Sequence, residues 1–274
     1  MPIATINGLE IHYREKGEGF PVVLVHGFTG NSRNWALTVP VLTRTFRTIS
    51  VDLRGHGHSA KPVRPEDYTL EAMADDVYAL LQHLGVRECY LAGHSMGGMV
   101  SQHIVLDHPE LVRALVLVDT AAEIPAGLVN QERLAERERL VAIAREQGME
   151  AVFEEQLRAN PLRERIETNP EFLRTWREQF LLTSKEAYIY GAHGMASRKS
   201  LLGELHRVSV PALVICGEND EPFLEASRKM HAAVPGSRLE IIAGAGHSPQ
   251  IETPAAFNAL IAGFLSKVHE TAAA

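Results

Sequence analysis

The chain has 274 residues, of which 45% are hydrophobic and 22% charged, so it is long enough to bury a large core. Its formal net charge is -7 at pH 7 and no basic run stands out, which argues against a nucleic-acid or anionic-membrane partner. The N-terminus lacks a basic segment followed by an apolar one, and no apolar stretch approaches the roughly 18 residues that a membrane helix needs. We therefore expect a cytoplasmic globular protein; the sequence does not predict its oligomeric state.

The first 120 residues alternate between short apolar runs and helical patterns. A turn at Asn7-Gly8 predicts a hairpin between the first two strands. The predicted strands are 4–6, 9–13, 22–25, 48–51, 89–92 and 114–118, and the predicted helices are 69–84 and 96–107. Strands that alternate with helices predict a parallel sheet that is covered on both faces.

The middle of the chain differs from both ends. Residues 124–202 are rich in Glu, Arg, Gln, Leu and Ala and contain no strand-like run, which predicts a wholly helical segment with a solvated charged face. Helix breaks are predicted at Gly148, Pro161 and Pro170. After Pro211 the alternation resumes, with strands 212–216 and 238–242 and helices 222–233 and 254–268. We expect an α/β core formed by residues 1–122 and 203–274, with residues 123–202 as a helical cap insertion.

The segment Gly93-His94-Ser95-Met96-Gly97 ends a predicted strand and leads directly into a helix. A sharp turn between a strand and a helix exposes the serine hydroxyl, and the flanking glycines allow the close backbone approach that such a turn requires. The first amides of the helix point toward the same place. Ser95 is therefore the predicted nucleophile, and the N–H of Met96 is predicted to donate to an oxyanion.

A serine needs a base to accept its proton and a carboxylate to orient that base. His247 is our candidate base because it follows a predicted strand, and ligands in parallel sheets bind at the carboxyl ends of strands. By the same reasoning Asp220, in the loop after strand 212–216, is the candidate carboxylate. Its neighbours Glu218 and Glu221 are either solvated loop charges or the true partner, and Asp119, at the end of strand 114–118, is the runner-up.

A second oxyanion donor is expected from the loop His26-Gly27-Phe28-Thr29-Gly30, which follows the predicted central strand. The backbone N–H of Phe28 is the predicted donor, whereas His26 is predicted to hydrogen-bond within the loop. Phe28, Met96 and Trp35 are expected to shape a mostly apolar substrate pocket, although core packing is an equally good interpretation of Trp35.

At these residues the chain resembles the α/β-hydrolase superfamily. The matching landmarks occur in the family's order: His26-Gly27, Asp52-Leu53-Arg54-Gly55-His56-Gly57-His58-Ser59, Gly93 to Gly98, Gly217-Glu218-Asn219-Asp220 and Gly246-His247. The resemblance implies an eight-stranded, mostly parallel sheet with a helical cap above Ser95. The core is most similar to small carboxylesterases, 3-oxoadipate enol-lactonases and the carbon-carbon bond hydrolases of ring-cleavage products.

The resemblance implies a serine hydrolase that cleaves small carboxylic esters or lactones without a cofactor. Haloalkane dehalogenases and epoxide hydrolases carry aspartate where Ser95 stands, so their chemistry is not expected. Three alternatives use the same fold: carbon-carbon bond hydrolysis, perhydrolysis through a peracid, and a ligand-binding receptor that keeps the triad. No metal site is expected at His56 and His58, because no carboxylate or cysteine cluster accompanies them. Cys89 and Cys216 are predicted to be buried free thiols.

Overall fold

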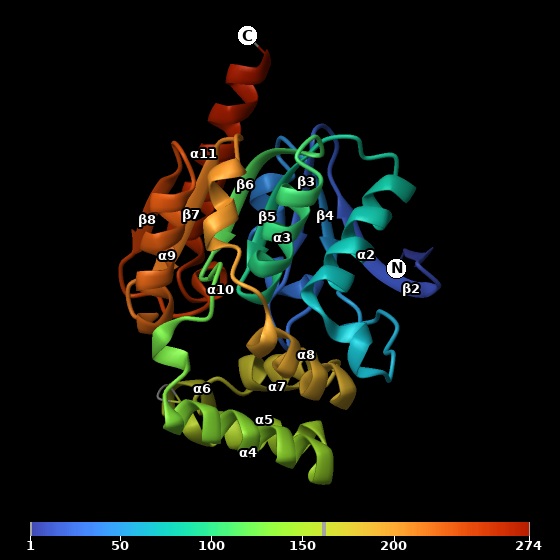
Figure 1. The fold of residues 1–274 in the computed structure, drawn as a ribbon, viewed down its shortest axis with the longest axis vertical. Coiled ribbons are helices and arrows are strands. Elements are labelled where there is room, and N and C mark those ends of the chain that lie inside the picture. Colours follow the sequence, from blue (N-terminus) through green and yellow to red (C-terminus); the bar gives the residue numbers. More distant parts are fainter. Residues whose placement is uncertain (1, 161–162, 274) are drawn as a thin grey trace.

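The computed structural model describes residues 2–160 and 163–273, and it contains one eight-stranded sheet (Figure 1). In space the strands follow the order β1-β2-β4-β3-β5-β6-β7-β8. Their bounds are β1 Ile3–Ile6, β2 Leu9–Lys16, β3 Pro21–Val25, β4 Arg47–Val51, β5 Cys89–His94, β6 Val112–Val118, β7 Ala212–Gly217 and β8 Arg238–Ile242. Each strand coincides with a predicted one.

Strands β3 to β8 run parallel, whereas β1 and β2 pair antiparallel with each other and β2 pairs antiparallel with β4. The predicted hairpin joins β1 to β2, and Asn7 and Gly8 both have positive φ angles, 51° and 78°. Two successive positive φ angles match the right-handed twist of the flanking strands. The predicted eight-stranded, mostly parallel sheet is confirmed.

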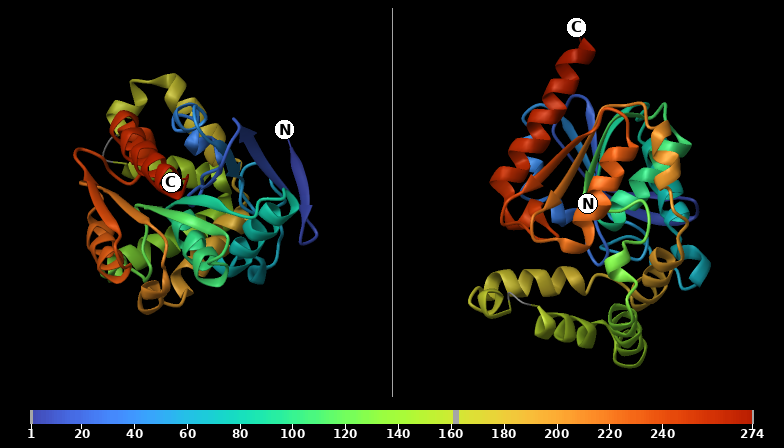
Figure 2. Two further views of the ribbon diagram at one scale, coloured as in Figure 1. Left: turned by 90° about the horizontal axis from the view of Figure 1, so that it is seen from above. Right: turned by 60° about the vertical axis from the view of Figure 1, so that its left-hand side comes forward.

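Helices cover both faces of this sheet, as Figure 2 shows. Helices α2, α3 and α9 pack on the face that carries Val23 and Val25, and α1 and α11 pack on the face that carries Val22 and Leu24. Successive side chains of a strand point to opposite faces of the sheet, so one apolar run provides buried side chains for both faces. The helices of the core are α1 Val39–Leu42, α2 Leu70–His83, α3 Met96–Asp107, α9 Glu221–Ala233, α10 Pro249–Glu252 and α11 Pro254–Ala273.

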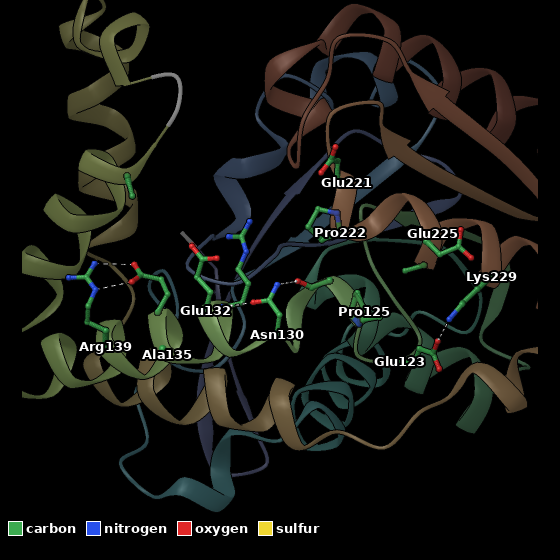
Figure 3. Close-up of a pocket in the computed structure, with 16 residues that line it drawn as sticks. Glu123, Pro125, Asn130, Glu132, Ala135, Arg139, Glu221, Pro222, Glu225 and Lys229 are labelled. Atoms are coloured by element: carbon green, nitrogen blue, oxygen red, sulfur yellow. Dashed lines mark hydrogen bonds and ion pairs between the residues drawn. The ribbon is translucent and has the colours of Figure 1, made fainter.

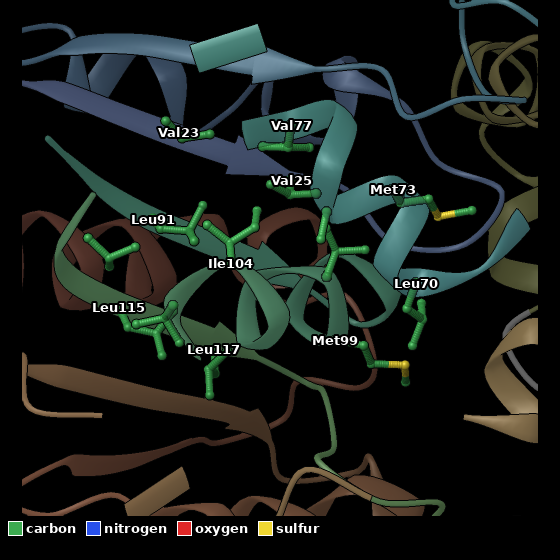
Figure 4. Close-up of a cluster of buried hydrophobic side chains, with 14 of the residues drawn as sticks. Val23, Val25, Leu70, Met73, Val77, Leu91, Met99, Ile104, Leu115 and Leu117 are labelled. Atoms are coloured by element: carbon green, nitrogen blue, oxygen red, sulfur yellow. The ribbon is translucent and has the colours of Figure 1, made fainter. Parts of the chain in front are cut away.

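Helix α3 lies at the centre of the larger core cluster (Figure 4). Every residue from Met96 to Leu106 is buried, because the helix packs against β5 and β6 on one side and against α2 on another. Ile104, for example, lies near Leu91 of β5. The start of α3, which follows Ser95, is therefore held rigidly.

Between β6 and β7 the chain forms five helices that lie beyond one end of the sheet (Figure 1). These cap helices are α4 Gln131–Gln147, α5 Met149–Ala159, α6 Arg163–Glu167, α7 Pro170–Phe180 and α8 Lys185–Ser197. They share a separate apolar cluster that includes Phe153 and Phe180. Gly148, with φ 87°, separates α4 from α5, and Pro170 begins α7, whereas the predicted break at Pro161 lies outside the described residues.

Four 3-10 turns complete the described chain: η1 Ser32–Trp35, η2 Pro65–Tyr68, η3 Ala126–Leu128 and η4 Leu202–Arg207. No helix in residues 2–160 and 163–273 has both the length and the apolar character needed to cross a bilayer.

Candidate active site

Ser95 occupies the turn between β5 and α3, with φ 51° and ψ -117°. A non-glycine residue rarely adopts this conformation, and it persists only where the surroundings impose it. Here the surroundings are tight: a Cβ added to Gly93 would lie 2.3 Å from the carbonyl oxygen of Gly97, and one added to Gly97 would lie 2.3 Å from that of Val25. The two glycines therefore allow the strand and helix to approach closely enough to hold Ser95 in this turn.

Ser95, His247 and Asp220 form a chain of hydrogen bonds. The Oγ of Ser95 lies 3.0 Å from Nε2 of His247, and Nδ1 of His247 lies 2.7 Å from Oδ2 of Asp220. Asp220 is buried, whereas the His247 side chain is 41% exposed. With the carboxylate on Nδ1, the imidazole carries its proton there and presents a lone pair on Nε2 to the serine.

Asp119, the alternative carboxylate, does not contact His247 but lies beside Asp220. It is fully buried with φ 43°, and its Oδ1 accepts a hydrogen bond of 2.8 Å from the N–H of Gly217. Its Oδ2 has no donor among the described residues. Burial raises the pKa of Asp119 to about 9, and the neighbouring carboxylate of Asp220 adds to this rise. Asp119 is therefore neutral at pH 7, which leaves Asp220 as the charged member of the pair.

The loop from His26 to Gly30 lies beside the serine, because a Cβ added to Gly27 would lie 3.1 Å from the Cβ of Ser95. In the described part of the chain, no protein acceptor is found for the backbone N–H of Phe28 or Met96. An oxyanion needs free amide donors beside the attacking serine, so both groups remain candidate donors. His26 serves the loop, as predicted: its Nδ1 donates to the carbonyl of Gly27 and its Nε2 accepts from the N–H of Leu53.

Comparison with known proteins identifies the family. The model of the alpha/beta hydrolase fold family matches residues 21–254. The chain belongs to this family. A putative 2-succinyl-6-hydroxy-2,4-cyclohexadiene-1-carboxylate synthase of Bacillus subtilis is 30% identical over 259 residues, which cover 90% of each chain.

Solved structures of this family give the same assignment. An enol-lactonase from Burkholderia xenovorans LB400 has a TM-score of 0.86 and 31% identity, over 97% of this chain and 100% of the other. A thermophilic esterase from Thermogutta terrifontis, with malate bound, has a TM-score of 0.84 and 32% identity, over 98% of each chain.

In this α/β hydrolase, side chains also hold the backbone on both sides of His247. The carboxylate of Glu252 accepts hydrogen bonds from the N–H groups of Gly246 and Ser248, at 2.7 and 2.9 Å. His94 Nε2 lies 2.6 Å from the carbonyl oxygen of His247 and must carry a proton to donate to it. Burial lowers the pKa of His94 to about 3, so this imidazole is neutral. No sequence pattern predicts such a role for His94 or Glu252.

A cavity of about 680 Å³ lies between the core of the α/β hydrolase and its cap, and Ser95 and His247 line it. The Phe28 ring stacks on Tyr188 of α8, with ring centroids 5.1 Å apart. The remaining apolar lining residues include Met99, Leu128, Leu140, Val141, Ile166, Phe172, Trp176, Phe180, Met195, Phe223 and Ile251. Most of these belong to the cap, where the sequence showed only a helical pattern.

Two pocket predictions need correction. Trp35 is fully buried in the core and packs against Phe257, with ring centroids 6.2 Å apart, so it does not line the cavity. It faces inward because η1 turns its ring under the sheet face that α11 covers. The Met96 side chain is also buried in the core, and Met99, almost one helical turn later, lines the cavity instead.

A second cavity, of about 1070 Å³, lies between α4 and α9 (Figure 3). Glutamates predominate among its charged groups, and Glu123 is paired with Lys229 at 2.7 Å. Pro125, Arg133 and Glu136 line both cavities, so the two are neighbours.

One cluster of possible metal ligands occurs in the described residues, formed by Asp119, Cys216 and Asp220, whose ligand atoms lie within 4.8 Å of one another. Burial raises the pKa of the Cys216 thiol, and Asp119 is protonated, so neither offers the charged form that a metal prefers. Asp220 already accepts from His247. The residues therefore fit a hydrogen-bonded triad better than a metal site. At His56, Nδ1 donates to the carbonyl of Arg54, which leaves that nitrogen no lone pair for a metal.

Proposed function

We propose that this α/β hydrolase cleaves small carboxylic esters or lactones through an acyl-enzyme on Ser95. The observation that carries the proposal is the hydrogen-bonded chain Ser95–His247–Asp220, with contacts of 3.0 and 2.7 Å. Acyl transfer by a serine requires a base within hydrogen-bond distance of the serine and a carboxylate that orients this base.

In the proposed mechanism, Nε2 of His247 accepts the Ser95 proton as Oγ attacks the substrate carbonyl. The carbonyl oxygen becomes negative and receives hydrogen bonds from the free amides of Phe28 and Met96. His247 then gives the proton to the leaving alcohol, or to the ring-opened hydroxyl of a lactone. Water, activated by the same histidine, attacks the acyl-enzyme and releases the acid. Asp220 stabilises the imidazolium in both steps.

The proposed substrate class rests on the size of the cavity and on the relatives. A volume of about 680 Å³ with mostly apolar walls suits a small molecule. Two similar structures, each with more than 30% identity, are an enol-lactonase and an esterase. We propose that residues 123–202 act as the cap that excludes bulk water from this cavity during the reaction.

Hydrolysis of 4-nitrophenyl acetate and butyrate, together with labelling by a phosphonate probe, tests the proposal. Wild-type protein should turn over the esters and gain one phosphonyl group by intact mass, and Ser95→Ala should do neither. Ser101→Ala is a matched control, because Ser101 lies on the next turn of α3 with its hydroxyl bonded to the Gly97 carbonyl. Labelling without ester turnover would favour carbon-carbon bond hydrolysis or a receptor role instead. Turnover that survives Ser95→Ala would contradict the mechanism.

A further inference from the structure

Three arginines line the cavity that contains Ser95. Arg133 and Arg137 lie one turn apart on α4, and Arg198 follows the end of α8. The next cavity-lining residues of α4 are Leu140 and Val141. Residues at this spacing share one helix face, so the α4 wall of the cavity changes from cationic to apolar along the helix.

The guanidinium groups of Arg137 and Arg198 are only partly hydrogen-bonded. In both, Nε is buried without a hydrogen-bond partner among the described residues. The other nitrogens of Arg198 donate to the backbone carbonyls of Met195 and Glu123, which carry no compensating charge. Burial lowers the pKa of Arg198 to about 10. A terminal nitrogen of Arg137 donates to the carboxylate of the exposed Glu138, at 3.2 Å.

The carboxylates that line the cavity are already engaged. Glu136 accepts two hydrogen bonds from Arg139, at 2.8 and 3.0 Å, drawn as dashed lines at Arg139 in Figure 3. Glu252 accepts from the two backbone amides beside His247. Glu123, beside Arg198, is paired with Lys229. Among the described residues, Arg198 therefore donates to backbone carbonyls alone and Arg137 pairs only with the exposed Glu138, which leaves both able to bind a ligand.

We propose that the arginines form a subsite for a carboxylate, so that the substrate is an ester or lactone that also carries a free carboxylate group. The proposal rests on the ester hydrolysis proposed above and names its substrate class. A buried N–H without an acceptor is costly, and the donors of a guanidinium match the two oxygens of a carboxylate. The apolar wall beyond Arg137 would hold the hydrocarbon part of the same molecule.

Two chain-matched esters test the subsite: 4-nitrophenyl hydrogen glutarate and 4-nitrophenyl valerate, each corrected for hydrolysis without enzyme. For the wild type we expect kcat/KM to be at least about tenfold higher for the glutarate ester, as a charge-assisted hydrogen bond provides. Arg137→Gln should reduce that ratio about tenfold, mainly through KM. The matched control is Arg145→Gln, on the exposed surface of α4 outside the cavity, and it should keep the wild-type ratio.

If the wild type has similar kcat/KM values for the two esters and Arg137→Gln does not change their ratio, the subsite is refuted, whereas the proposed ester hydrolysis is still supported. Calorimetric binding of glutarate to Ser95→Ala gives a readout that does not need turnover. If Ser95→Ala binds glutarate saturably and the double variant with Arg137→Gln binds it at least tenfold more weakly, the subsite is supported even if no ester is hydrolysed. Equal binding to both proteins would refute it.

Discussion

Replacing Asp119 with asparagine should stabilise the protein, by an amount that grows with pH. Asparagine keeps the shape of the side chain: its oxygen can accept from the N–H of Gly217, and its amide can donate to the carboxylate of Asp220. The exchange removes the proton that Asp119 must hold in the folded protein. It does not remove a charge, because burial raises the pKa of Asp119 to about 9.

The magnitude follows from proton linkage. In the unfolded chain Asp119 loses its proton above its ordinary pKa of 3.8, whereas in the folded protein it keeps the proton up to about pH 9. Between these values the folded state holds one more proton, so wild-type stability falls by about 1.4 kcal/mol per pH unit relative to Asp119→Asn. From pH 3.8 to 7 the difference reaches about 4 kcal/mol, provided that the amide fits equally well. Above about pH 9 it should grow no further.

Urea unfolding at pH 4, 5.5, 7 and 9 measures this difference, with fluorescence of the buried Trp35 as the signal. Asp107→Asn, at the exposed end of α3, is the control and should give a difference that does not vary with pH. If the difference in unfolding free energy between Asp119→Asn and the wild type does not vary with pH, Asp119 is not protonated in the folded protein. Hydrolysis by Asp119→Asn should stay within a few-fold of the wild type, because Asp119 does not contact His247.

Three further outcomes follow from the site. Asp220→Asn should lower kcat about 10³- to 10⁴-fold, because the amide no longer favours the His247 tautomer with its lone pair on Nε2; a loss below tenfold would contradict the acid assignment. Glu252→Gln should lower kcat about tenfold with little change in KM, because the glutamine oxygen can accept from only one of the two N–H groups beside His247. Steady-state kinetics measures both constants, and an unchanged kcat would contradict this role of Glu252. Burial lowers the pKa of His56 and of His94 to about 3, so each stays neutral in the folded protein but takes up a proton below pH 6.5 in the unfolded chain. In Asp119→Asn, which lacks the opposing change from Asp119, stability should therefore fall by about 2 kcal/mol for each histidine between pH 6.5 and 5, and equal urea midpoints of this variant at the two pH values would exclude this.

The fold and the hydrogen-bonded chain were predictable because their signals are local. A parallel strand buried on both faces is a short apolar run, and each run here became a strand. Ser95, Asp220 and His247 each follow such a run, and the carboxyl ends of parallel strands meet at one edge of the sheet. Knowing the strands was thus enough to bring together residues far apart in the sequence.

The cavity was not predictable in this way, because its walls come from cap helices whose sequence is dominated by charge. Helix α4 has only two buried residues, Val141 and Ala144, so its pattern gives little indication of the face that turns toward Ser95. Trp35 shows the converse error, since an aromatic residue close in sequence to the oxyanion loop packs into the core instead. The orphaned Nε of Arg137 appears only once α4 is packed over the core. If residues 123–202 select the substrate as proposed, exchanging the cavity-lining residues of α4 should change specificity while leaving the chemistry of Ser95 intact.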